Sequence, residues 1–219
     1  MLNQPEALSR PKPRLRGVSH QFAAFVAMPA VVALWAGAGT FAARLGAGVY
    51  GTCLLALFTI SAAYHRPTWS PGVRDLIGRI DQSAIFLFIA GTFTPFGLLF
   101  GPGGRFTVLA VVWAGALGGV IIALAWPGAP KIVMAGIYVL FAWALTGVVP
   151  MLHHVVGPSV LGLVVAGGVV YTTGAVVYAL RRPDPLPRVF GYHEIFHLFV
   201  VAAAALHFAA VWMALRLLP

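Results

Sequence analysis

The hydropathy pattern constrains this chain more than any other feature of its sequence. Seven apolar segments follow one another, and each is about as long as the ~20 residues that a membrane-spanning helix requires. Only 9% of the residues are charged and 60% are hydrophobic, whereas about a quarter of a soluble domain is charged. We therefore predict an all-α fold, a bundle of seven transmembrane helices. The predicted spans are residues 21–43, 47–65, 80–100, 106–126, 131–150, 157–180 and 193–216.

The segments that separate these spans are rich in proline and glycine, which end helices sharply. No second domain is apparent, so we predict a polar N-terminal tail at residues 1–20 and one helical membrane domain at residues 21–219. Cys53 lies inside an apolar segment. The sequence therefore predicts neither a disulfide framework nor a thiolate metal cluster.

The basic residues between the spans predict the orientation. With a cytoplasmic N-terminus, the inside segments hold eleven Lys and Arg residues and the outside segments hold three. Positive charge accumulates on the cytoplasmic side of membrane proteins, so we expect the N-terminus inside and the C-terminus outside. The net charge of +9 then faces anionic lipid headgroups, and we expect no nucleic-acid partner. The inside residues are Arg10, Lys12, Arg14, Arg16, Arg66, Arg74, Arg79, Lys131, Arg181, Arg182 and Arg188; the outside residues are Arg44, Arg105 and Arg216.

A histidine pair opens the last apolar segment. His193 and His197 are four residues apart, so on a helix they lie ~40° apart in azimuth and ~6 Å apart along the axis. Two imidazoles so placed can share a metal ion, most commonly zinc. Burying a pair of imidazoles at the end of a membrane helix is costly without such a partner.

The predicted topology places other polar residues at the same depth as this pair. His65 ends the second span and Asp81 begins the third, both on the cytoplasmic side. Ser61 precedes His65 by four residues and therefore lies on the same helical face, one turn deeper. Three histidines and a carboxylate at one depth form a plausible metal site in the cytoplasmic leaflet. Three nitrogen ligands with water in the fourth position is the open geometry of hydrolytic zinc sites.

Simpler interpretations compete with this one. Asp81 could pair with Arg79 or Arg74 instead, and Glu194 could be a carboxylate favoured by the N-terminus of a helix. His207 lies ~15–20 Å deeper than the pair, so we interpret it as a hydrogen-bonded packing residue.

The other histidines resemble ordinary interfacial residues. A lone histidine at the membrane surface is more often a headgroup contact than a metal ligand. We interpret His20, His153 and His154 in this way, with the last two in an outside loop that lacks an acidic partner.

Three motifs together resemble those of the hemolysin III family. They are Ser61-x-x-x-His65, the stretch from Asp81 to Phe86 continued by Ile89 to Phe96, and His193-Glu194-Ile195-Phe196-His197 with Val200 to Ala204 after it. This family is the bacterial branch of the progestin and adipoQ receptor (PAQR) group, within a wider superfamily that includes alkaline ceramidases. The resemblance spans nearly the whole chain.

The resemblance implies seven transmembrane helices in the bacterial inner (plasma) membrane, an inside N-terminus and an intramembrane zinc ion. It implies that His65, His193 and His197 are the zinc ligands, that Asp81 holds the metal-bound water and that Ser61 supports the site. The receptor members carry a substantial cytoplasmic N-terminal region, but only about twenty residues precede the first span here. We therefore do not expect hormone reception. No span presents the repeated polar face of a water-filled pore either.

Three functions remain open at this point. The leading hypothesis is zinc-dependent hydrolysis of a lipid amide or ester, with membrane lipids as the partners. The alternative is a structural or sensory zinc in a protein that regulates membrane lipid state without turnover. A third interpretation takes His193-Glu194-x-x-His197 as the H-E-x-x-H motif of zinc proteases, with Glu194 as general base. It leaves His65 unexplained, and the extended form of the motif fails because residue 203 is alanine.

Overall fold

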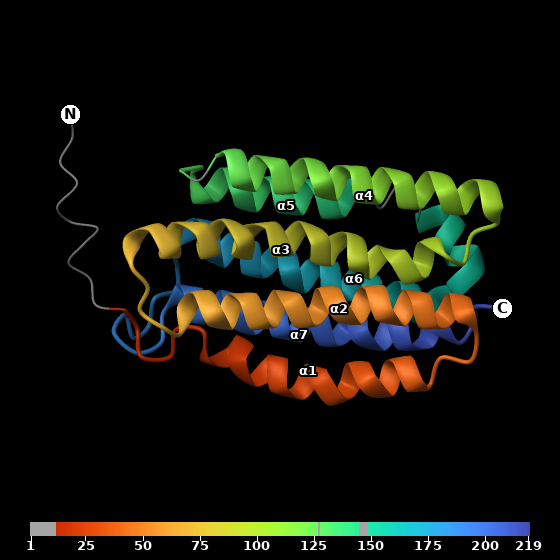
Figure 1. Ribbon diagram of the computed structural model, residues 1–219, viewed down its shortest axis with the longest axis horizontal. Helices are drawn as coiled ribbons and strands as arrows, with labels where there is room; N and C mark the ends of the chain where they lie inside the picture. Colours follow the sequence, from red (N-terminus) through yellow and green to blue (C-terminus); the bar gives the residue numbers. More distant parts are fainter. Residues whose placement is uncertain (1–11, 127, 145–148) are drawn as a thin grey trace.

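The structure, a computed structural model, describes residues 12–126, 128–144 and 149–219. Within these residues the chain forms seven α-helices and no β-strand, which confirms the predicted all-α fold. The helices lie side by side along the long axis of the molecule, with α3 and α6 between the α4–α5 pair and the α1, α2 and α7 group (Figure 1). Their bounds are α1 Val18–Ala36, α2 Phe41–His65, α3 Pro71–Gly97, α4 Pro102–Ala125, α5 Lys131–Ala144, α6 Val149–Leu180 and α7 Tyr192–Leu215.

Six of the described helices are long and apolar enough to cross a membrane. The remaining helix, α5, is apolar but shorter, with 14 residues, and part of the predicted fifth span at 145–148 lies outside the described residues. Large apolar side chains on α1, such as Phe22, Phe25 and Val26, are about two-thirds exposed, as expected for a surface in contact with lipid. The chain is therefore a multi-pass membrane protein, and the count of seven spans and the orientation stay predictions.

The loop between the first two helices lies at a different position from the predicted one. Helix α1 ends at Ala36 rather than near residue 43, and α2 begins at Phe41 rather than near residue 47. The reason is a cap: the Thr40 side chain accepts a hydrogen bond of 3.2 Å from the backbone N–H of Ala43. A threonine in this position starts a helix even within an apolar stretch.

Two other helices begin earlier than predicted. Helix α3 begins at Pro71 instead of near residue 80, because proline is favoured in the first turn of a helix, where its missing N–H costs nothing. Helix α6 begins at Val149 instead of near residue 157, but it is broken at Gly157, which has φ +74° and precedes Pro158, so the predicted start marks the break between its two helical stretches.

Small residues bring the helices together. Gly91 of α3 lies against Cys53 of α2, and a Cβ at position 91 would come within 2.7 Å of the Cys53 side chain. Such close backbone approach is typical of helix packing in lipid. This contact sets the spacing of α2 and α3, the two helices that carry His65 and Asp81.

Candidate metal centre

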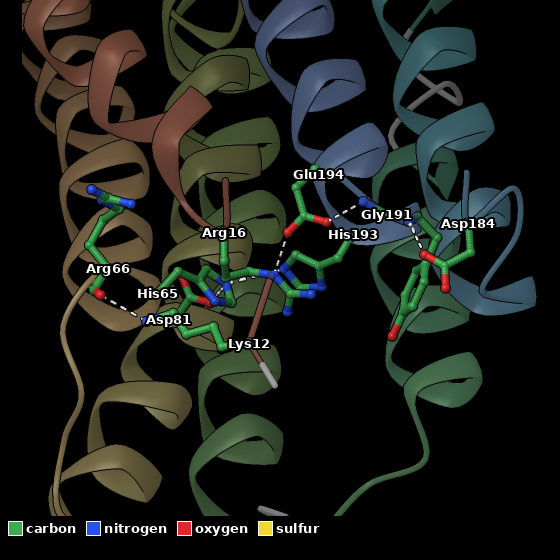
Figure 2. Close-up of polar contacts among 10 residues, drawn as sticks. Lys12, Arg16, His65, Arg66, Asp81, Asp184, Gly191, His193 and Glu194 are labelled. Carbon is green, nitrogen blue, oxygen red and sulfur yellow. Dashed lines mark hydrogen bonds and ion pairs between the residues drawn. The ribbon is translucent and has the colours of Figure 1, made fainter. Parts of the chain in front are cut away.

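One end of the bundle gathers the polar residues that the sequence placed at a common depth. His65 is the last residue of α2, while His193 is the second residue of α7 and His197 lies one turn further along it. All three side chains are buried, and one nitrogen from each lies within 4.8 Å of the others. Figure 2 shows His65 and His193 facing one another from opposite helices. We call His65, His193 and His197 the histidine cluster.

The geometry of the histidine cluster suits a tetrahedral cation. The Nε2 atoms of His65 and His193 are 3.2 Å apart. Two imidazole nitrogens bound to one tetrahedral zinc at ~2.0–2.1 Å lie about 3.3 Å apart. The Nδ1 atoms of His193 and His197 are buried without a hydrogen-bond partner among the described residues. Three imidazoles gathered in a buried site are costly without a partner, and a cation shared by their converging nitrogens would offset that cost.

Asp81 supplies a carboxylate beside the cluster. Its Oδ2 atom is 3.9 Å from His65 Nε2, and its side chain is 17% exposed against 8% for His65, so this is the more accessible side of the site. Pairing with Arg79 or Arg74 is not what the structure shows. The Arg79 guanidinium donates to the carbonyl oxygen of Leu124, and Arg74 lies over the Tyr64 ring.

Ser61 lies on the face of α2 that the spacing predicted. It is buried one turn before His65, and its side chain interacts with that of Asp81. Its Oγ atom is also 2.8 Å from the Nδ1 atom of His20. A hydroxyl is both donor and acceptor, so Ser61 can serve both neighbours at once.

The prediction that His20 is a headgroup contact is wrong. His20 is only 3% exposed, and its ring stacks on that of His197 with centroids 3.9 Å apart and planes 6° apart. The error arose because His20 begins an apolar run and no polar residue follows it at helical spacing. The predicted topology was the signal that could have identified it, since the first span begins at the same depth as His65.

The remaining histidines lie away from the cluster. His207 is buried on α7, and its Nε2 atom is 3.0 Å from the carbonyl oxygen of Val164, which confirms the packing role. His153 and His154 belong to helix α6, not to a loop as predicted. Both are exposed, and their contact with lipid headgroups stays a prediction.

Glu194 is directed away from the cluster although it follows His193 in the chain. Its carboxylate accepts a hydrogen bond of 2.8 Å from the backbone N–H of Gly191 and an ion-paired hydrogen bond from Arg16 (Figure 2). This confirms the interpretation of a carboxylate at a helix N-terminus. A general base must reach the reacting water, and this carboxylate is already engaged, which speaks against the protease interpretation.

The segment before α1 covers this end of the bundle. Lys12 Nζ donates hydrogen bonds to the carbonyl oxygens of Arg66 and Pro67, at 2.8 and 3.1 Å. The backbone N–H groups of Arg14 and Leu15 bind the α6–α7 loop. Partial burial and then the nearby arginine charges lower the pKa of Lys12 below its usual value. Lys12 and Arg16 therefore place basic side chains at the end of the bundle that holds the histidine cluster.

Fold and site together define a class: a multi-pass helical membrane protein with a buried three-histidine cluster at one end of its bundle. The family model described as haemolysin-III related matches residues 8–208, so the chain belongs to this family, which confirms the resemblance found in the motifs.

Curated relatives agree with this assignment. The chain is 33% identical over 202 residues to Hemolysin-3 of Bacillus cereus, which covers 89% of this chain and 87% of that protein. It is 30% identical over 203 residues to the Hemolysin-3 homolog of Bacillus subtilis, covering 89% and 90% of the two chains. It is also 28% identical over 174 residues to the monocyte to macrophage differentiation factor of Homo sapiens, covering 77% and 70%. This last relative is a PAQR-related protein.

Proposed function

We propose that this protein is a zinc-dependent hydrolase that cleaves an amide or ester bond of a membrane lipid. One observation carries the proposal: a partly exposed carboxylate, Asp81, lies 3.9 Å from an imidazole of a buried cluster whose donor nitrogens suit zinc. Three imidazoles leave a tetrahedral ion one open position, and a carboxylate beside that position is the arrangement of hydrolytic sites.

Each residue of the site has its own role in the proposed hydrolysis. His65, His193 and His197 would hold a zinc ion, which when bound would supply a Lewis acid to polarise a carbonyl group and acidify water. Asp81 accepts the proton of the attacking water and passes it to the leaving amine or alcohol as the C–N or C–O bond breaks. Ser61 holds the Asp81 carboxylate in place through its hydroxyl.

The location of the site favours a lipid substrate. The cluster lies at the ends of α2 and α7, within helices whose outer surfaces are apolar. An acyl chain can therefore stay in the bilayer while its amide or ester group reaches Asp81. We place the protein in the bacterial inner membrane with this end of the bundle in the cytoplasmic leaflet, as the distribution of basic residues predicts.

The test is lipid hydrolysis by the purified full-length protein, loaded with zinc and offered a panel of amide and ester lipids. We expect release of fatty acid or sphingoid base, and we expect His197→Ala to abolish it. His207→Ala is the matched control, because His207 is a buried histidine of the same helix that contacts Val164 instead of the cluster. Equal inactivity of the wild type and His197→Ala across the panel would contradict hydrolysis.

A second function is a zinc clip without turnover, in a protein that senses or regulates membrane lipid state. It is favoured by the burial of all three histidines and by their origin on two different helices, α2 and α7, which one ion would tie together. Under this proposal, zinc removal lowers the unfolding temperature and the wild type hydrolyses no lipid. Metal content, unfolding temperature and lipid release, measured on one preparation, distinguish the two functions.

A further inference from the structure

His20 is a fourth buried imidazole at the metal centre, yet it is not one of the three whose nitrogens converge. It lies in the first turn of α1, the helix that carries none of the histidine cluster. Its contacts are the Ser61 hydroxyl at 2.8 Å, the face of the His197 ring at 3.9 Å and the Phe58 ring at 5.2 Å between centroids. Two of these three neighbours belong to the candidate site.

A hydrogen bond joins His20 to Ser61, one turn before the candidate ligand His65. Ser61 has one hydroxyl hydrogen and two polar neighbours, His20 and Asp81. A hydroxyl can donate one hydrogen bond and accept others, so it can bond to the imidazole and interact with the carboxylate at once. The Ser61 side chain therefore lies between His20 and Asp81.

Ring stacking connects His20 to His197. A metal-bound histidine is normally oriented by a hydrogen bond from its other ring nitrogen. The Nδ1 atom of His197 is buried and has no such partner among the described residues. The His20 ring lies almost parallel to that of His197, 6° from coplanar, and covers its face. Stacking thus takes over the orienting role that the missing hydrogen bond would play.

The segment before α1 holds His20 in place. Gly17 caps the helix with φ +78°, and a Cβ at this position would come within 2.7 Å of the Cβ atom of His65. Arg16 pairs with Glu194 at the start of α7. These contacts attach the first turn of α1 directly to the two helices that carry the histidine cluster.

We propose that His20 is a positioning residue of this centre: it orients His197 by stacking and orients Asp81 through Ser61, without being a ligand itself. The inference rests on the metal-binding part of the proposed function, and it adds a residue from a helix that neither the motifs nor the resemblance assigned to the site.

The experiment measures metal affinity of the full-length protein in detergent, by competition with a zinc chelator, and the absorption spectrum of the Co²⁺-loaded protein. His20→Phe keeps a ring on His197 but removes the hydrogen bond to Ser61. His20→Asn keeps a polar group for Ser61 but removes the ring, and His20→Ala removes both. Loss of an orienting partner typically lowers metal affinity by 10–100-fold. We expect a loss in this range for His20→Ala, smaller losses for the other two variants, and an altered Co²⁺ spectrum in His20→Asn.

A double substitution tests the route through Ser61. If His20 acts on Asp81 through that hydroxyl, adding His20→Phe to Ser61→Ala lowers affinity little beyond Ser61→Ala alone. Ser83→Ala is the matched control, because the Ser83 hydroxyl binds the carbonyl oxygen of Arg79 in its own helix and should leave affinity unchanged. Unfolding of each variant in excess chelator reports whether it is folded without metal.

Affinity of His20→Ala within twofold of the wild type would overturn the inference. So would fully additive losses in the double variant, or X-ray absorption that shows four imidazoles on the metal. A wild type that binds no divalent cation overturns the inference and the proposed function together. If the affinities change as expected but the wild type hydrolyses no lipid, the role of His20 is supported and only hydrolysis is contradicted. If the wild type hydrolyses lipid but His20→Ala binds metal as tightly as the wild type, hydrolysis is supported and the role of His20 is contradicted.

Discussion

At the residue scale, His193 and Glu194 show how neighbours in the chain acquire different roles. Successive residues of an α-helix are rotated by about 100°, so the first turn of α7 presents His193 to the cluster and Glu194 to Gly191 and Arg16. Both side chains are buried, yet only one faces His65. The H-E-x-x-H pattern alone could not separate these roles.

The glutamate can therefore be replaced without loss of the site. We expect Glu194→Gln to retain zinc and most of the lipid hydrolysis, because its carboxylate is a cap and an ion-pair partner. Losing the charge-assisted hydrogen bond to Arg16 should lower the free energy of unfolding by about 1–3 kcal/mol. Thermal unfolding and turnover, measured side by side, check this. Complete loss of turnover with zinc retained would restore the protease interpretation.

Asp81 should show the opposite pattern. Asp81→Asn preserves the size of the side chain but removes the group that accepts the proton of water, so we expect zinc binding to persist and hydrolysis to fall by 10²-fold or more. Metal content and initial rates of lipid hydrolysis are the measurements. An Asp81→Asn protein as active as the wild type would exclude Asp81 as the base.

At the scale of the element, helix ends position the site. His65 closes α2 and His193 opens α7, so the length and register of these helices decide where the imidazoles lie. Helix caps and first-turn prolines also explain why α1, α2 and α3 differ from the hydropathy segments. Hydropathy reports where a chain is apolar, whereas a helix begins and ends where its backbone is capped.

The contact between α2 and α3 can be tested directly. Gly91→Ala adds a methyl group against Cys53, and we expect it to lower the free energy of unfolding by about 1–3 kcal/mol through overpacking. Cys53→Ala in the same protein should recover part of this loss, because it removes the sulfur atom at the contact. Gly118→Ala is the control, since no atom lies within 4 Å of a Cβ built there. Equal effects at positions 91 and 118 would show that this close approach does not matter.

At the scale of the whole molecule, the start of α1 and the C-terminus lie at opposite ends of the bundle (Figure 1). An odd number of helices that run alternately up and down has this consequence. The eleven-to-three distribution of basic residues then predicts that the end with the histidine cluster faces the cytoplasm. Under the proposed function, orientation decides which leaflet supplies the substrate.

Labelling of single cysteines tests this orientation. In a Cys53→Ala background, we expect Gly101→Cys, in the α3–α4 loop, to react with a membrane-impermeant thiol reagent in intact cells. Arg182→Cys, in the α6–α7 loop, should react only after permeabilisation. The reversed pattern would place the histidine cluster on the outer side.

The sequence by itself determined the class of fold, the number of apolar segments and the common depth of His65, Asp81, His193 and His197, with Ser61 one turn deeper. These features depend on composition along the chain and on spacing within single helices, which are local properties. Only the tertiary structure decided that His20 stacks on His197, that Glu194 turns to Arg16 and that Asp81 does not pair with Arg74. Each of these depends on how a helix is rotated about its own axis against its neighbours. Where nearly every face is apolar, that rotation comes from close packing between helices and leaves no signal in the hydropathy of any one of them.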